Sequence, residues 1–288
     1  MDKILEITNL SKHYKDFSLK NLNLSLDRGF IMGFIGPNGA GKSTTIKLIM
    51  NLIAKDSGEI KVFGMDHLKH EMEIKERIGI VYDSSHFYED LTIQQMKNTV
   101  RLFYKNWDDT VFYAYVQKFN LPTSKKIKDL SKGMKMKFSL AVALSYHPEL
   151  LIMDEPTSGL DPLVRNELLD ILMEFIQDER KGILFSTHIT SDLDKVADFI
   201  TLIHNGELIF SKQKDDIFEQ YRVFKGRKDL LTAETRPFFI GIKENEFGFE
   251  GLIQDINQCK QMFGSNIILE KPNLEDIMLF YTRGGQSV

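Results

Sequence analysis

The 288-residue chain is long enough for one large domain, or for a medium-sized domain with a smaller appendage. Hydrophobic residues make up 42% and charged residues 27%, a balance typical of folded globular proteins that excludes a largely disordered chain. The formal net charge of -4, from 37 Lys and Arg against 41 Asp and Glu, excludes a global attraction to nucleic acid or anionic lipid, so any anion site must be local.

The chain offers little for disulfide chemistry, export or membrane insertion. Cys259 is its single cysteine and can form neither an internal disulfide nor a cysteine-rich metal site, which fits a reducing compartment. Residues 1–10 are charged and strand-like and lack the basic-then-apolar pattern of a signal peptide. Apolar runs such as 150–153 are far shorter than the roughly 20 residues that span a bilayer. We therefore expect any membrane association to come through partner proteins.

The first third of the chain predicts a strand, a glycine-rich loop and a helix in that order. Residues 22–26 alternate leucine with polar residues, which is typical of a half-buried strand. A turn at 27–29 leads into the apolar run 30–35, which predicts a buried central strand. After the glycine-rich loop, Ile and Leu recur at helical spacing over 46–53. Residues 78–82 predict a further short strand.

The middle of the chain predicts a helical insertion. From residue 91 to 146 the pattern is mainly helical, and Thr92 with Gln95 forms a candidate capping box. We place this helical subdomain at about 84–147.

Strands and helices alternate again after the insertion. Residues 150–153 and 183–186 predict two buried strands, and Asp161 can cap the intervening helix, which Pro162 opens. This alternation predicts a largely parallel sheet. Asn205-Gly206 predicts a hairpin, because both central residues of a type I′ turn need positive φ.

We place a domain boundary near Gln213, which divides the chain into a main domain, 1–213, a connector, 214–220, and a small C-terminal α+β domain, 221–288. No internal repeat or low-complexity tract is present, which excludes solenoids and arrays. In the C-terminal domain the expected strands are 221–226, 238–242 and 266–269, and the expected helices are 251–262 and 274–281.

The strongest chemical signal is the segment 36–43, which matches G-x-x-x-x-G-K-[ST] between a predicted strand and a predicted helix. The glycines let backbone N–H groups turn inward around phosphates, and the positive end of the following helix faces them. Lys42 is then expected to neutralise the β and γ phosphates, and the Ser43 hydroxyl to bind Mg²⁺. We interpret this segment as a phosphate-binding loop.

Two acids end the predicted strand 150–153. Taken alone, Asp154 and Glu155 fit a strand that simply meets solvent. Beside a phosphate-binding loop, however, Asp154 is suited to the Mg²⁺ shell, and Glu155 to accepting a proton from an attacking water.

Three further motifs complete a resemblance. The LSKGM segment at 130–134 stands upstream of the acidic strand, the SGLD segment at 158–161 follows it, and His188 follows the next strand. With the phosphate loop and the acidic strand, they are similar in kind and order to the signature, D-loop and switch histidine of ABC transporter nucleotide-binding domains. The resemblance covers residues 1 to about 213, and helicases and GTPases that share the phosphate loop lack this set.

The resemblance implies a P-loop NTPase core of the α/β class, with a parallel central sheet, an N-terminal antiparallel part and a helical insertion. It implies that Tyr14 stacks on adenine and that His188 contacts the γ-phosphate and helps to orient the water and Glu155. It also implies that Ser131 and Gly133 touch phosphate and that Asp161 belongs to the nucleotide site. The remaining implied nucleotide contacts are Gly36, Pro37, Asn38, Gly39, Ala40, Gly41, Lys42, Ser43 and Thr44.

Two departures from the family pattern stand out. Lys132 and Met134 replace the Gly and Gln that many relatives carry in the signature, although Ser131 is kept. Asp83 stands where the family commonly has a glutamine that reaches Mg²⁺ and water, so we treat it as an uncertain metal ligand beside Ser43 and Asp154. Such variants resemble a subgroup of ABC-2 type exporters with separate membrane subunits, including exporters of antimicrobial or amphipathic peptides. The tail 273–284 also resembles that subgroup.

The resemblance implies an enzyme that converts ATP and water to ADP and phosphate with Mg²⁺ and powers the transport of peptides, drugs or lipids. Its implied partners are a second ATPase subunit, either the same chain or a related paralogue, and separate transmembrane permease subunits, without nucleic acid. Its implied location is the cytoplasmic face of the cell membrane, held there by those subunits. The alternatives are a soluble ABC ATPase that remodels ribosomes or chromosomes, and a regulatory nucleotide switch with weak turnover, which Asp83 favours.

Overall fold

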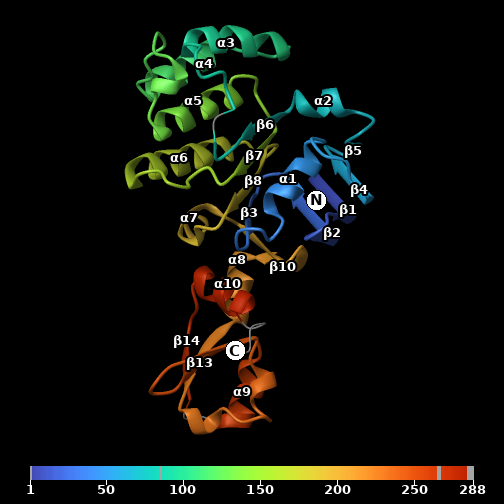
Figure 1. Cartoon of the computed structure of the whole chain (residues 1–288), viewed down its shortest axis with the longest axis vertical. Coiled ribbons are helices and arrows are strands. Elements are labelled where there is room, and N and C mark those ends of the chain that lie inside the picture. The colour runs from blue at the N-terminus through green and yellow to red at the C-terminus, as the bar shows by residue number, and fades with distance from the viewer. Residues whose placement is uncertain (1, 85, 265–266, 284–288) are drawn as a thin grey trace.

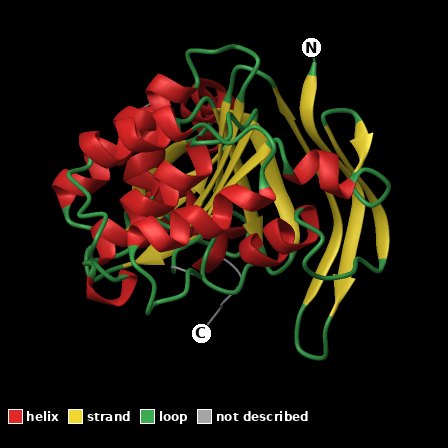
Figure 2. Cartoon of the chain, turned by 90° about the horizontal axis from the view of Figure 1, so that it is seen from above, coloured by secondary structure: helices red, strands yellow, loops and turns green. Residues whose placement is uncertain are grey.

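A computed structural model describes residues 2–84, 86–264 and 267–283 of the chain. Its described strands form three sheets, and Figure 1 shows the N-terminal and central elements above a small C-terminal unit. Figure 2 shows most of the helices on one side of the central strands and the antiparallel N-terminal strands on the other side. Within the described part of the chain, no helix is both long and apolar enough to cross a bilayer.

The N-terminal sheet is antiparallel and has the strand order β2-β1-β4-β5. Leu22, Leu24 and Leu26 are buried while their polar neighbours are exposed, so the alternation predicted for this strand is confirmed. The short helix α2, Glu71–Lys75, follows this sheet. The strands are β1 (Lys3–His13), β2 (Ser18–Asp27), β4 (Ser57–Val62) and β5 (Met65–Asp66).

The central sheet has six strands in the order β10-β9-β3-β8-β7-β6, and only β10 is antiparallel to its neighbour. Every residue of β3 and β7 is buried, as expected for strands covered on both faces. The predicted parallel sheet is therefore confirmed. The strands are β3 (Ile31–Ile35), β6 (Ile78–Val81), β7 (Leu150–Asp154), β8 (Gly182–Thr187), β9 (Phe199–His204) and β10 (Glu207–Gln213).

Two helices of the main unit begin at the caps that the sequence indicated. Thr92 and Gln95 form the predicted capping box, with the Gln95 N–H 3.2 Å from the Thr92 hydroxyl. Asp161 caps the helix that Pro162 opens. The helices are α1 (Lys42–Ile49), α3 (Ile93–Val100), α4 (Asp109–Lys118), α5 (Lys132–Leu144), α6 (Pro162–Phe175) and α7 (Thr190–Val196).

The turn between β9 and β10 has the predicted geometry. Asn205 has a φ of 48° and Gly206 a φ of 76°, the positive values that a type I′ turn requires. A Cβ on Gly206 would lie 1.8 Å from the carbonyl oxygen of Ser18, so the hairpin also needs glycine in order to approach β2.

The predicted connector is helix α8, Lys214–Gln220, and it leads to an antiparallel sheet of order β12-β13-β11-β14. A separate aromatic core, which includes Phe224 and Phe249, fills this C-terminal unit. The elements are β11 (Arg222–Gly226), β12 (Gly241–Glu244), β13 (Phe249–Ile253), α9 (Ile256–Phe263), β14 (Ile268–Glu270) and α10 (Leu274–Arg283).

Two expectations for the C-terminal unit were wrong. The strand expected at 238–242 starts only at Gly241, because Arg236–Phe238 forms a 3₁₀ turn around Pro237, which has no N–H for a ladder. The helix expected at 251–262 starts only after its cap Asp255, because the preceding apolar residues pair as β13 with strands on both sides. Asn266, where a strand was expected to begin, lies outside the described residues.

The last helix joins the C-terminal unit to the main core. Leu274, Ile277 and Phe280 of α10 are buried in the same hydrophobic cluster as Leu193 and Val196 of α7. Figure 1 shows α10 at the junction between the two parts. The C-terminal unit therefore shares its hydrophobic interior with the unit that carries the phosphate loop.

A carboxylate between two arginines ties the antiparallel sheet to the central sheet. Glu149, just before β7, accepts hydrogen bonds from Arg77 at 2.6 Å and from Arg28 at 2.8 Å. The Arg77 guanidinium also lies 4.0 Å from the ring centroid of Phe63. The bond from Arg77, followed by that from Arg28, holds the pKa of the Glu149 carboxyl below its usual range, although partial burial opposes this.

We expect Glu149→Gln to lower the free energy of unfolding by about 1 kcal/mol near neutral pH, since the pair is partly solvent-screened. Because the pKa of Glu149 is lowered in the folded protein, its contribution to the free energy of unfolding is present above the pKa of about 4.3 in the unfolded chain. This contribution is lost as the pH falls through the pKa of the folded protein. Urea unfolding from about pH 7 down to about pH 2, which includes the range below about 4.3 where the contribution is lost, checks this trend. Glu59→Gln, an exposed glutamate on β4, is the matched control, and an equal loss there would contradict the tether.

Candidate functional site

The glycine-rich loop between β3 and α1 has a backbone shape that only glycine fits at two positions. A Cβ on Gly36 would lie 2.3 Å from the carbonyl oxygen of Ile203. Gly41 has a φ of 115°, and a Cβ there would lie 3.0 Å from the ring of Phe17. The loop is therefore held against β9 and the N-terminal sheet, and helix α1 begins directly after it.

Lys42 folds back over this loop and is only 5% exposed. Its Nζ donates to the carbonyl oxygen of Gly36 at 2.7 Å and to that of Pro37 at 3.3 Å. The same Nζ lies 3.3 Å from Oε1 of Glu155. The loop carbonyls and one carboxylate thus stabilise a cation at the centre of the loop.

The two acids at the end of β7 have different surroundings. Burial raises the pKa of the Asp154 carboxyl, against the opposing effect of hydrogen bonds from Ser43 and Ser186; the Ser186 hydroxyl is 3.0 Å away. Glu155 has a φ of 51°, an uncommon left-handed conformation for a residue with a side chain. Strain of this kind concentrates at functional sites, and here it turns the Glu155 carboxylate toward Lys42.

His188 holds the other oxygen of the Glu155 carboxylate. Its backbone N–H donates to Oε2 at 3.2 Å, and its ring Nδ1 lies 2.6 Å from the same atom. The two residues meet because β7 and β8 are parallel neighbours, with Asp154 opposite Ser186. Glu155 and His188, which are far apart in the sequence, are therefore in direct contact.

One cavity borders the end of the glycine loop and the two acids, and we call it the phosphate-loop cavity. It has a volume of about 550 Å³ and is lined by Ser43, Asp154 and Glu155 together with Asp83. Asp83 is also among the charges that raise the pKa of Asp154. The loop that carries Asp83 therefore enters the site. The sequence alone left undecided whether it does.

Tyr14 lies at the end of the N-terminal sheet and is 45% exposed. Its ring centroid is 6.4 Å from that of Phe17, whose ring touches Gly41 of the glycine loop. Lys12 Nζ lies 5.6 Å from the Tyr14 ring centroid. Tyr14 thus offers an accessible ring near the loop. Sequence reasoning missed Phe17, because no motif marks it and only its contact with Gly41 reveals its place.

The remaining predicted residues lie outside the phosphate-loop cavity of the same chain. Ser131 caps α5, where its hydroxyl accepts the Met134 N–H at 3.2 Å, and Gly133 faces Val164 of α6. Asp161 caps α6 and does not line that cavity either. A single chain therefore brings Lys42, Glu155 and His188 together and lines the phosphate-loop cavity with Ser43 and both acids, but its signature residues do not line that cavity.

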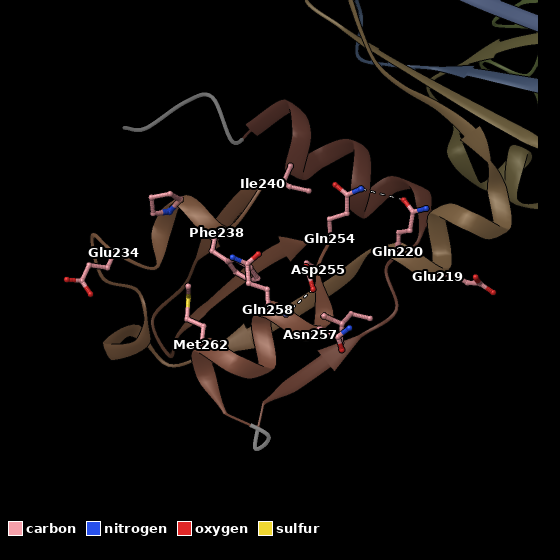
Figure 3. A pocket seen from close by; sticks show the side chains of 12 residues that line it. Glu219, Gln220, Glu234, Phe238, Ile240, Gln254, Asp255, Asn257, Gln258 and Met262 are labelled. Carbon is pink, nitrogen blue, oxygen red and sulfur yellow. Dashed lines mark hydrogen bonds between the residues drawn. The ribbon is translucent and has the colours of Figure 1, made fainter.

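Another cavity, of about 900 Å³, lies in the C-terminal unit (Figure 3). Amide and acidic side chains dominate its polar lining, and Figure 3 shows Gln254 bonded to Gln220 and Asp255 bonded to Gln258. No lysine, arginine, histidine or serine lines it. It therefore lacks a cation that could bind phosphate.

Comparisons with known proteins support a common family for most of the chain. A family profile described as ABC transporter matches residues 19–158. A second profile, described as an AAA domain and putative AbiEii toxin of a type IV TA system, matches residues 126–194. The first match includes the glycine loop and both acids.

Relatives and a solved structure agree with this match. The bacitracin transport ATP-binding protein BcrA of Bacillus licheniformis is 36% identical over 308 residues, and the alignment covers 99% of each chain. The lantibiotic transport ATP-binding protein SrtF of Streptococcus pyogenes is 33% identical, covering 78% of this chain and 100% of that protein. A solved ATP-binding subunit of an ABC transporter is 31% identical with a TM-score of 0.69, covering 75% of this chain and 92% of that one.

Two alanine substitutions separate the role of loop shape from simple flexibility. Gly36→Ala must displace a backbone carbonyl, so we expect ATP affinity to fall about tenfold or more. Gly39→Ala meets no atom within 4 Å and pays only the left-handed backbone penalty of about 1 kcal/mol, so its loss is smaller. Equilibrium binding of a fluorescent ATP analogue measures both, and equal losses would contradict the steric account.

Proposed function

The chain belongs to the ABC transporter ATP-binding family, and on that premise we propose that it hydrolyses Mg-ATP, as a dimer, to drive separate membrane subunits. The observation that supports hydrolysis most directly is the Glu155 carboxylate held between Lys42 Nζ at 3.3 Å and His188 Nδ1 at 2.6 Å. A carboxylate positioned in this way beside a phosphate loop can accept the proton of an attacking water.

The site residues divide the chemistry among them. Lys42 and the loop N–H groups stabilise the phosphate charge. When the nucleotide binds, the Lys42 ammonium leaves its loop carbonyls and contacts the phosphates. His188 fixes the direction of the Glu155 carboxylate and lies where a γ-phosphate would approach. Water attack on the γ-phosphorus breaks its bond to the bridging oxygen, and Glu155 takes the proton of the water, which gives ADP and phosphate. Tyr14 stacks on the adenine.

The residues present fit Mg²⁺. The Ser43 hydroxyl donates to the Asp154 carboxylate, so one neutral and one acidic oxygen donor already adjoin each other at the end of the loop. The described residues contain no group of three or more His, Cys, Asp or Glu ligands, which suits an ion that completes its shell with water and phosphate oxygens. Bound there by Ser43 and Asp154, Mg²⁺ would neutralise phosphate charge, and its presence would offset the burial that raises the pKa of Asp154.

Two chains are needed to complete each site. Ser131 and Gly133 lie outside the phosphate-loop cavity of their own chain. In a dimer, the N-terminus of α5 from one chain can face the nucleotide of the other and add positive potential. The partner is a second copy or a related paralogue, and Asp161 at the N-terminus of α6 lies in the same contact region.

The relatives suggest the cargo. BcrA carries bacitracin transport in its description and SrtF lantibiotic transport, and the BcrA alignment spans both units of this chain. We therefore propose export of a peptide antibiotic or a similar amphipathic molecule, with the chain bound to permease subunits at the cytoplasmic face of the membrane. A pull-down from detergent-solubilised membranes tests this: a permease should co-purify, and recovery of ribosomes or chromosomal proteins instead would contradict transport.

Glu155→Gln keeps the shape of the side chain and removes its proton acceptor. We expect ATP binding to persist while hydrolysis falls about 10²–10⁴-fold, and an ATP-bound dimer to accumulate on a sizing column. Phosphate release measures the rate. Glu59→Gln on β4 is the isosteric control and should hydrolyse ATP normally; wild-type turnover in Glu155→Gln itself would remove Glu155 from the mechanism.

Mixing two inactive variants tests the shared site. A dimer of one Lys42→Ala chain and one Ser131→Arg chain carries both lesions in one composite site and none in the other. We expect mixed dimers to recover activity that neither homodimer has, because the intact site contains both groups. Light scattering should follow ATP-dependent dimerisation in parallel. Full turnover by a strict monomer at all concentrations would exclude the shared-site mechanism.

A further inference from the structure

The loop that carries Asp83 borders two cavities. Tyr82, Asp83 and Ser84 line the phosphate-loop cavity, and the same three residues line a second cavity of about 370 Å³. The second cavity is bounded by the first half of α5, including Lys132 and Lys135, and we call it the α5 cavity. The exposed Asp83 carboxylate can therefore serve either side by a local rotation.

The two cavities differ in charge. On the phosphate-loop side, the cavity is lined by Asp154 and Glu155 against one lysine, Lys47, together with His86. The charge of Asp83 already contributes to the raised pKa of Asp154. On the α5 side the cavity is lined by two lysines, Lys132 and Lys135, against one other acid, Glu89. Lys135 is paired with Glu89 at 3.2 Å. An additional negative charge in the phosphate-loop cavity therefore favours the α5 side for the Asp83 carboxylate.

Lys132 is the available partner in the α5 cavity. No carboxylate in the described part of the chain lies within 4 Å of its amino group. The Lys132 amino group instead lies against Gly159, where a Cβ would be 2.9 Å from Nζ. Lys132 is thus a cation without a counter-ion, on the first turn of the helix that Ser131 caps.

We propose that ATP binding moves the Asp83 carboxylate from the phosphate-loop cavity to an ion pair with Lys132. The phosphates repel Asp83, and Lys132 receives it on α5. Asp83 and Lys132 are then positioning residues. They couple nucleotide binding in one chain to α5 of that chain, the helix that completes the nucleotide site of the partner. This inference rests on the proposed function, because it assumes that the N-terminus of α5 completes the partner's site.

Asp83 and Lys132 both depart from the family pattern, and this ion pair explains the two departures together. A neutral residue at either position would leave the other charge without its partner in the ATP-bound state. The inference therefore predicts that the effects of Asp83 and Lys132 substitutions depend on each other, whereas Asp83 acting only as a metal ligand, or Lys132 acting only on the partner's phosphates, predicts independent effects.

A double-mutant cycle on the full chain tests the pairing. ATP affinity is measured in EDTA for wild type, Asp83→Asn, Lys132→Gln and the double variant, so neither Mg²⁺ nor hydrolysis contributes. We expect Lys132→Gln to weaken ATP binding about threefold when Asp83 is present and to have no effect when Asn replaces it. Lys132→Arg keeps the charge and should retain wild-type affinity.

Lys137→Gln is the matched control. Lys137 lies on the same helix and pairs with Glu167, but it does not line the α5 cavity. It should leave ATP affinity unchanged in both backgrounds. Circular dichroism checks the fold of each variant, which should persist because Asp83 and Lys132 are exposed.

The outcomes separate the inference from the function on which it rests. Equal effects of Lys132→Gln in both backgrounds would overturn the pairing, and a changed Mg²⁺ requirement of Asp83→Asn without coupling would assign Asp83 to the metal instead. If the wild-type chain shows no hydrolysis that depends on Glu155, the proposed function is overturned, while the binding cycle is unaffected. A wild-type chain that does not bind ATP would overturn both.

Discussion

Lys42 carries its ammonium group into a region where it is only 5% exposed, and the surrounding architecture compensates that charge. Two loop carbonyls and the Glu155 carboxylate surround Nζ, and His188 holds the second oxygen of that carboxylate. A buried cation without such partners would be strongly destabilising. The close approach of β3, β7 and β8 in one parallel sheet places these groups together, so the site depends on the strand order.

The same compensation makes the site responsive to ligand. Lys42 donates to carbonyls that a phosphate can replace, and burial raises the pKa of the Asp154 carboxyl. An anion bound together with a metal ion, as proposed, would compensate the charges on both sides of the loop at once. Catalytic charge and ligand affinity thus come from the same few groups, which is the usual arrangement in phosphoryl transfer.

The C-terminal unit is not simply suspended from the main unit. Helix α10 packs its apolar residues against α7, which begins two residues after His188. Tyr221, at the start of the C-terminal unit, shares a hydroxyl contact of 2.9 Å with Tyr281 of α10 and packs on Phe210 of β10. A displacement of this unit would therefore reach β10 and also α7, the helix that follows His188, whereas none of its described residues lines the phosphate-loop cavity.

The sequence alone determined the features that are local: the glycine loop with its strand and helix, the caps formed by Thr92 and Asp161, and the Asn205-Gly206 turn. In each case the residue type itself sets the backbone conformation or the hydrogen bond. It failed at 251–255, where a short apolar run fits either a strand or a helix and only the pairing of β13 with β11 and β12 decided the outcome. Only the tertiary structure decided that Glu155 touches His188, that the Asp83 loop borders two cavities and that α10 joins the main core. These are contacts between segments distant in the chain, and strand order and packing, which no local pattern encodes, bring them together.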